Sequence, residues 1–185
     1  MVRTLILIPK MFSREEFKKL TGVIPEDFND VSKEFWDYVK QKLKPLVQKV
    51  KKVYYEESLM KVEKRLKQKS EYSIIKMLLE NNGSLICEDS SLVAETEAWL
   101  EMLNKQRDNG AIELYEETVK ERKEYIAKKI NQTLKEGEIG VFLTNLNSNM
   151  PFSEDIRIIK MCRFDPTDYL KRWQKKLELA RADPI

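Results

Sequence analysis

Two adjacent carboxylates, Glu88 and Asp89, are the side chains in the sequence best placed to do chemistry. They follow a short apolar segment at residues 84–87, which predicts a buried strand. Carboxylates at the end of such a strand can ligate Mg²⁺ or act as a general acid and base. Helix capping explains them as well, because acidic side chains beside Ser90 suit the positive end of a helix dipole. Capping is the simpler interpretation, but both residues also remain candidates for metal ligands.

Two cations on a long predicted helix would complement these carboxylates. The helix is expected to begin at Ile112 and to end before Gly137, and Arg122 and Lys123 flank its apolar stripe. If the two side chains point inward, they can bind an anion or pair with one of the carboxylates. If they point outward, they cover the rim of the core while their charges stay in water. The sequence leaves both orientations open.

Polar residues in two further loops complete the candidate set. Ser13 lies in the loop after the first predicted strand, and Asn145 and Asn147 follow a strand predicted at 141–143. In a parallel sheet these loops meet the carboxylate loop at one edge, where α/β proteins bind ligands. Asparagines can hydrogen-bond a ligand but transfer no proton, and turn formation also explains them. We therefore predict a polar crevice formed by Ser13, Glu88, Asp89, Arg122, Lys123, Asn145 and Asn147.

The chain of 185 residues contains no histidine, so His-dependent catalysis and zinc–histidine sites are excluded. Gly137 and Gly140 lie between a helix and a strand, which is the wrong order for a phosphate-binding loop. Cys87 and Cys162 have no metal-binding or redox spacing and are expected to be buried free thiols. We therefore assign no catalytic residue and predict no cofactor, with Mg²⁺ entering only if the adjacent carboxylates ligate it.

The net charge is only +3, from 34 basic and 31 acidic residues, and 42% of the residues are hydrophobic. Basic segments near 40–52 and 61–69 are interleaved with acidic and core positions, so no nucleic-acid partner is predicted. The apolar run near the N-terminus is too short to span a membrane and lacks a signal-peptide pattern, so we expect a cytoplasmic location. The bias to Lys and Glu would suit a thermophile. The sequence identifies no partner and leaves self-association into a homo-oligomer open.

Apolar runs separated by helical patterns set the expected fold. Strands are predicted at residues 4–8, 49–55, 84–87, 141–143 and 156–161. Helices lie between most of them, and such alternation is typical of a mainly parallel sheet. We predict a single α/β domain over residues 1–185, with three layers, about five strands and helices on both faces. The last strand has only a short link from its predecessor, from Thr144 to Ser153, so its direction is left open.

Side-chain caps and chain breaks predict where the helices begin and end. The spacing of Ser13 and Glu16 is that of a capping box, which starts a helix ending near Leu20. The other expected caps are Asn29 or Asp30, Ser90 or Ser91, and Asp165 followed by Pro166. The expected breaks are Pro45, Asn81-Asn82-Gly83, which would end a helix over 59–79, and Arg107-Asp108-Asn109-Gly110.

Four segments resemble a family of uncharacterised archaeal and bacterial α/β proteins. They are Leu5-Ile6-Leu7-Ile8-Pro9, Glu88-Asp89, Arg122-Lys123-Glu124-Tyr125-Ile126-Ala127 and Ile130-Asn131-Gln132-Thr133-Leu134-Lys135-Glu136-Gly137-Glu138-Ile139-Gly140-Val141-Phe142-Leu143. That family is distantly similar to the TraB, ChaN-like and erythromycin-esterase-like group. The resemblance implies an α/β fold and places any active site in the loops named above.

This chain departs from the family's pattern at the positions of its ionisable residues. The family has histidine near the position of Phe12 and again where this chain has Thr144-Asn145-Leu146-Asn147, and Lys123 replaces an aspartate. The resemblance therefore implies a degenerate, non-catalytic member with a polar crevice for a small anionic ligand or a partner. Two alternatives stay open. One is a carboxylate- and Mg²⁺-dependent hydrolase-like enzyme, and the other is a homo-oligomeric scaffold, which requires an apolar surface patch.

Overall fold

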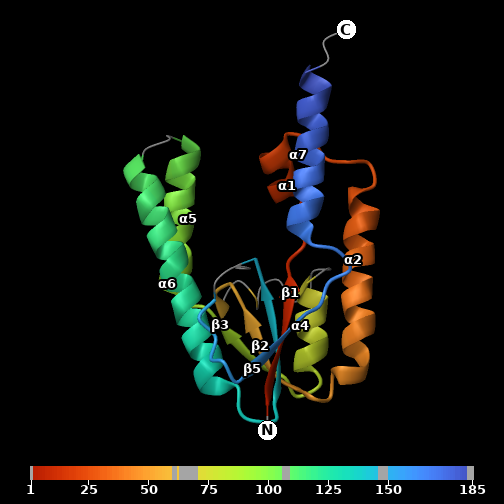
Figure 1. Ribbon diagram of the computed structural model, residues 1–185, viewed down its shortest axis with the longest axis vertical. Coiled ribbons are helices and arrows are strands. Elements are labelled where there is room, and N and C mark those ends of the chain that lie inside the picture. Colours follow the sequence, from red (N-terminus) through yellow and green to blue (C-terminus); the bar gives the residue numbers. More distant parts are fainter. Residues whose placement is uncertain (1, 60–61, 63–70, 106–108, 146–149, 183–185) are drawn as a thin grey trace.

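The computed structural model describes residues 2–59, 62, 71–105, 109–145 and 150–182. Its strands are β1 (Arg3–Pro9), β2 (Val50–Tyr55), β3 (Ser84–Cys87), β4 (Ile139–Thr144) and β5 (Ile156–Lys160). Its helices are α1 (Arg14–Thr21), α2 (Phe28–Leu43), the 3₁₀ helix η1 (Lys44–Leu46), α4 (Glu71–Leu79), α5 (Ser90–Lys105), α6 (Asn109–Thr133) and α7 (Pro166–Ala182). Within these residues the strands form one parallel sheet in the order β3-β2-β4-β1-β5, which confirms the predicted α/β fold (Figure 1).

Helices lie on both faces of the sheet, which gives three layers (Figure 1). Successive strand residues point to opposite faces. Ile6 belongs to the core cluster that contains Phe35 of α2 and Ile74 of α4, whereas the adjacent Leu5 belongs to the cluster that contains Ile130 of α6. Full burial of one such side chain contributes about 1.5–3 kcal/mol. The alternation of β1 residues between two apolar layers therefore holds this strand in the sheet interior.

The last strand, β5, pairs in parallel with β1 at one end of the sheet, which answers the question of its direction. Arg3 in β1 fixes the start of β5, because its guanidinium donates to both carboxylate oxygens of Asp155 at 2.7 and 2.6 Å. The same side chain donates to the backbone oxygens of Asn131 and Leu134. One arginine thus ties the last strand and the end of α6 to the same point of the sheet.

Two predicted helix starts are confirmed. Ser13 and Glu16 form the capping box of α1, with each side chain bonded to the backbone N–H of the other residue. At the start of α7, the Asp165 side chain accepts the backbone N–H of Thr167 at 2.9 Å, and Pro166 occupies the first helical position. These local patterns depend on residues a few positions apart, which is why the sequence alone suffices to find them.

Two other predicted helix starts are wrong by a few residues. Helix α2 begins directly after Asp27, which makes no side-chain cap, and α5 begins directly after Asp89. The Asp89 side chain accepts the backbone N–H groups of Ser91 and Leu92, so it takes the role that was expected of a serine. The expected caps therefore lie inside the first helical turns: Asn29, Asp30, Ser90 and Ser91.

Two further expectations need correction, and a third falls partly outside the described residues. Helix α6 begins at Asn109, so Asn109 and Gly110 are helical, and residues 106–108 lie outside the described part. The helix expected over 59–79 is described as α4, from Glu71, because most of 60–70 lies outside that part as well. The expected break at Asn81-Asn82-Gly83 is confirmed, because α4 ends at Leu79, and Asn82 there has the left-handed conformation, with φ of 71°. Cys87 and Cys162, which were expected to be buried, are only partly buried.

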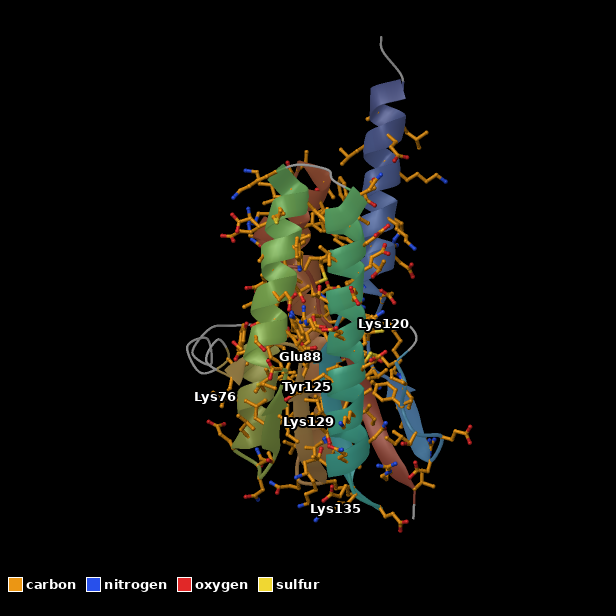
Figure 2. All side chains as sticks on the ribbon, turned by 90° about the vertical axis from the view of Figure 1, so that its left-hand side faces the viewer. Lys76, Glu88, Lys120, Tyr125, Lys129 and Lys135 are labelled. Carbon is orange, nitrogen blue, oxygen red and sulfur yellow. The ribbon has the colours of Figure 1, made fainter. Side chains whose placement is uncertain are left out.

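The carboxyl ends of the strands lie between two groups of helices. Helices α5 and α6 run side by side and extend beyond this edge of the sheet (Figure 1, Figure 2). Helices α1 and α7 stand at the same edge on the other side (Figure 1). None of the helices described is both long enough and apolar enough to cross a membrane.

Candidate functional site

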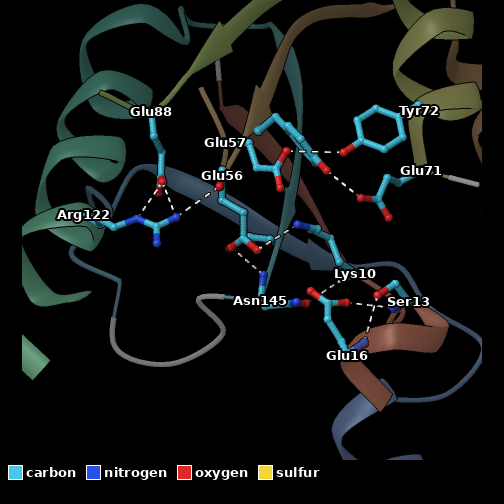
Figure 3. A network of polar contacts seen from close by, with 12 residues as sticks. Lys10, Ser13, Glu16, Glu56, Glu57, Glu71, Tyr72, Glu88, Arg122 and Asn145 are labelled. Carbon is cyan, nitrogen blue, oxygen red and sulfur yellow. Dashed lines mark hydrogen bonds and ion pairs between the residues drawn. The ribbon is translucent and has the colours of Figure 1, made fainter. Parts of the chain in front are cut away.

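The structure pairs Glu88 with Arg122, one of the arrangements considered for these residues (Figure 3). Arg122 projects from the middle of α6 and donates from Nε and Nη2 to Oε2 of Glu88, at 2.8 and 2.5 Å. Its Nη2 also donates to the backbone oxygen of Glu56 at 3.1 Å. The Glu88 side chain is 1% exposed, and its Oε1 has no hydrogen-bond partner among the described residues. Burial raises the pKa of Glu88 to about 7, although Arg122 acts in the opposite direction.

Asp89 does not join this pair. It lies at the start of α5, where its Oδ1 accepts the backbone N–H of Ser91 at 2.9 Å and also contacts the Ser91 hydroxyl. The hydrogen bonds from Ser91 lower the pKa of Asp89. The two adjacent carboxylates thus have different partners, which is the arrangement that helix capping requires. In the described ranges, no group of three or more carboxylate or thiol side chains is arranged to hold a metal ion.

The remaining candidates lie at the carboxyl edge but have structural partners. Ser13 caps α1. Asn145 links the ends of three strands, because its Oδ1 accepts the N–H of Lys10 at 3.1 Å and its own N–H donates to Oε2 of Glu56 at 2.6 Å. Lys123 is partly buried beside Arg122. Asn147 lies outside the residues that the structure describes.

A buried ammonium group, that of Lys10, lies at the centre of this edge (Figure 3). Lys10 follows β1, and its Nζ is 3.3 Å from Oε1 of Glu56 and 5.0 Å from the centroid of the Tyr55 ring. The side chains of Lys10 and Glu56 are 12% and 8% exposed. Burial alone would lower the pKa of Lys10, but the charges of Glu56 and Glu71 outweigh it, so the pKa is raised. Lys10 therefore stays protonated, with Glu56 as its counter-ion.

Two more carboxylates, Glu57 and Glu71, reach the same place from the end of β2 and the start of α4 (Figure 3). The Tyr72 hydroxyl donates to Oε2 of Glu57 at 3.3 Å, and the Tyr55 hydroxyl donates to Oε1 of Glu71 at 2.6 Å. The two tyrosine rings pack edge to face, with centroids 5.9 Å apart. Burial raises the pKa of Glu71. The tyrosine pair thus fixes the orientation of both carboxylates before any ligand arrives.

These side chains line a pocket of about 280 Å³ at the carboxyl ends of β1 and β2. Its inner end is polar and at least partly buried, and comprises Lys10, Glu57, Glu71 and Tyr72. One wall is apolar or aromatic, and comprises Met11, Phe12, Phe28 and Trp36. Its mouth is more exposed, and comprises Ser13, Arg14, Glu16, Asn29 and Ser32. The volume is near the lower end of the roughly 300–1,000 Å³ typical of small-molecule sites.

A wider cleft lies beside this pocket, between the α5–α6 pair on one side and α1 and α7 on the other. Two adjoining parts of it have volumes of about 790 and 930 Å³, and both are lined by Glu16, Leu100 and Asn145. Arg122 and Lys123 line the first part, and Glu57 lines the second. Glu57 lines the small pocket as well, so the cleft and the pocket adjoin at this residue.

The sequence-based candidate set omitted Lys10, Glu56, Glu57 and Glu71. One signal for Glu56 and Glu57 was available, because they follow a predicted strand just as Glu88 and Asp89 do. No local pattern marks Glu71, which was expected within a helix over 59–79, directly after an interruption considered at Lys69-Ser70.

Comparison of the chain with protein-family models, curated proteins and solved structures finds no match. The family resemblance noted in the sequence stays a prediction. The function is therefore inferred from the geometry of the pocket.

Proposed function

We propose that this protein is a non-catalytic binding protein whose small pocket takes a molecule with a protonated amine. The ammonium group of the ligand would lie between Glu57 and Glu71, beside Tyr72. One observation carries the proposal: among the described residues, three carboxylates, those of Glu56, Glu57 and Glu71, lie around the single ammonium group of Lys10, so the inner end holds more negative than positive charge. A ligand cation would add positive charge there and, as Lys10 does, would favour the ionised form of Glu71.

The other groups of the pocket suit the same ligand. Trp36 and Phe28 are 6% and 2% exposed and form an aromatic wall against which methylene groups can pack. Aromatic faces also attract cations, and the Lys10 ammonium over the Tyr55 ring is an example beside this pocket. The tyrosine hydroxyls hold both carboxylates in place, which reduces the entropy that binding would cost.

A small anion suits this edge of the sheet less well than the sequence suggested. The cations that would receive it, Arg122 and Lys10, are already engaged by Glu88 and Glu56. An anion near the inner end would also face the charge of Glu57. The geometry therefore favours an amine. It likewise gives little support to Mg²⁺ at Glu88 and Asp89, because the Asp89 carboxylate is bonded to the first turn of α5.

The size of the effect follows from the hydrogen bonds involved. A hydrogen bond to a charged group contributes about 1.5–3 kcal/mol. Removing the charge of one carboxylate should therefore weaken amine binding by about 10- to 100-fold. The substitutions Glu57→Gln and Glu71→Gln keep the shape of each side chain and an oxygen that accepts the tyrosine hydroxyl.

Isothermal titration calorimetry with isopentylamine tests the proposal, and 4-methylpentanoate serves as the anion of similar shape. Wild type should bind the amine in a saturable way and should not bind the acid. Both glutamine variants should bind the amine at least about 10-fold more weakly. The matched control is Glu80→Gln, directly after α4, where the side chain is 63% exposed, and it should bind as wild type does. Absence of saturable amine binding, or unchanged affinity in both pocket variants, would overturn the proposal.

A further inference from the structure

The charges of the small pocket are separated along its depth. The inner end holds Glu57 and Glu71, which are partly buried, whereas Arg14 lies exposed at the mouth. The guanidinium of Arg14 donates from Nη1 to Oδ1 of Asn29 at 3.0 Å, and this partner is neutral. No ion pair joins Arg14 to a carboxylate in the part of the chain that the structure describes. The mouth thus presents, near the carboxylate of Glu16, a cation that forms no ion pair among the described residues, whereas the inner end holds a carboxylate pair.

We infer that the ligand is a small amino acid, held as a zwitterion with its ammonium group at Glu57 and Glu71 and its carboxylate at Arg14. This inference rests on the proposed function and specifies its ligand. The apolar wall, which includes Trp36 and Phe28, lies along the same pocket and contacts the carbon chain of the amino acid. The carboxylate pair then contacts the ammonium group of the ligand, the apolar wall contacts its carbon chain, and the Arg14 guanidinium contacts its carboxylate.

Neutral donors at the mouth support a carboxylate at this position. The Asn29 side chain accepts from Arg14 through its oxygen, which leaves its amide N–H groups to donate. Ser32 adds a hydroxyl to the lining of the same pocket. A guanidinium flanked by neutral donors is a common carboxylate receptor, because the guanidinium and its neighbours hydrogen-bond both oxygens.

One residue at the mouth opposes a ligand carboxylate. Glu16 lines the pocket, and its Oε2 accepts the backbone N–H of Ser13 at 2.8 Å in the capping box of α1. Glutamine also serves at this position of a capping box, so Glu16→Gln keeps α1 intact while removing the charge. This variant should bind amino acids more tightly and simple amines less tightly than wild type does.

Calorimetry with two matched pairs tests the inference. Leucine is compared with isopentylamine, and 5-aminopentanoate with pentylamine, so that each zwitterion is set against an amine that lacks the carboxylate. Wild type should bind at least one zwitterion at least about 10-fold more tightly than its amine. The ammonium and carboxylate groups are closer together in leucine than in 5-aminopentanoate. The pair that shows the gain in affinity therefore indicates how far apart the pocket holds these two groups.

The variant Arg14→Gln separates this inference from the proposed function. It should remove the advantage of the zwitterion and leave the affinity for both amines unchanged. The control Arg172→Gln, an exposed arginine on α7 away from this pocket, should preserve the advantage. If amines and zwitterions bind equally, or if Arg14→Gln has no effect on the difference, the inference is overturned while amine binding stands. If no amine or amino acid binds, the proposed function fails together with it.

Discussion

Replacing Glu88 with glutamine should make the protein more stable at alkaline pH, although the substitution removes a buried ion pair. The Glu88 side chain is 1% exposed, and both hydrogen bonds from Arg122 reach the same oxygen, Oε2. The other oxygen, Oε1, has no partner among the residues described. The ion pair therefore compensates only part of what the carboxylate loses by leaving water, and burial raises the pKa of Glu88 to about 7.

The magnitude follows from the pKa of Glu88 in the two states. In the unfolded chain the group ionises near its ordinary pKa of 4.5. Between this pH and about 7, the folded protein holds a proton that the unfolded chain has lost, so stability falls as the pH rises through this window. The difference between the two pKa values corresponds to about 3 kcal/mol. Glutamine stays neutral at every pH and avoids this loss.

Urea denaturation of wild type and Glu88→Gln at pH 5 and at pH 8 measures the effect, with stability obtained by linear extrapolation. The free energies of unfolding should agree within about 1 kcal/mol at pH 5, where Glu88 is protonated. At pH 8 the glutamine variant should be more stable by about 3 kcal/mol. Other titrating groups are shared by both proteins and cancel in the difference.

The matched control is Glu101→Gln on α5, whose carboxylate is 69% exposed and pairs with Lys105. It should change stability by less than about 1 kcal/mol at either pH, as expected of an exposed ion pair. If Glu88→Gln is instead less stable than wild type at pH 8, the ion pair with Arg122 outweighs burial, and the reasoning is refuted.

Two further predictions concern the turn after α4 and the carboxylates after β3. Gly83→Ala should destabilise the protein by about 1–3 kcal/mol, because a Cβ at this position would lie 2.7 Å from the backbone oxygen of Leu78; urea denaturation measures this, and unchanged stability would show that the turn adjusts freely. Added Mg²⁺ should leave the melting temperature unchanged within about 1 °C in a thermal-shift assay, because the Asp89 carboxylate caps α5. A rise of several degrees that disappears in Asp89→Ala would restore the metal-site alternative.

Local patterns were sufficient for most of the fold. The apolar runs that became β1 and β4 are surrounded by core on both faces, so they read as strands without knowledge of the rest of the chain. The capping box at Ser13 works in the same way, because its partners are three residues apart. The start of α2 was misplaced because Asp27 precedes the helix without a side-chain hydrogen bond, so the best capping residues by type were not the ones used.

The site was predicted only in part, because its arrangement depends on strand order. β4 lies between β1 and β2, and its end brings Asn145 against both Lys10 and Glu56. The spacing of residues in the sequence does not reveal this strand order, because the three segments are far apart along the chain. Arg122 and Glu88 could be proposed as partners because opposite charges were expected at one edge. Glu71 could not be proposed as a site residue, because its approach to Tyr55 depends on where α4 begins.

The most direct test of the central claim is the affinity of isopentylamine for wild type and for Glu71→Gln, measured by titration calorimetry at one pH above neutrality. The pocket geometry predicts a saturable isotherm with one site for wild type and an affinity at least about 10-fold lower for the variant. No saturable heat for wild type, or equal affinities for the two proteins, would contradict the assignment of this pocket to an amine.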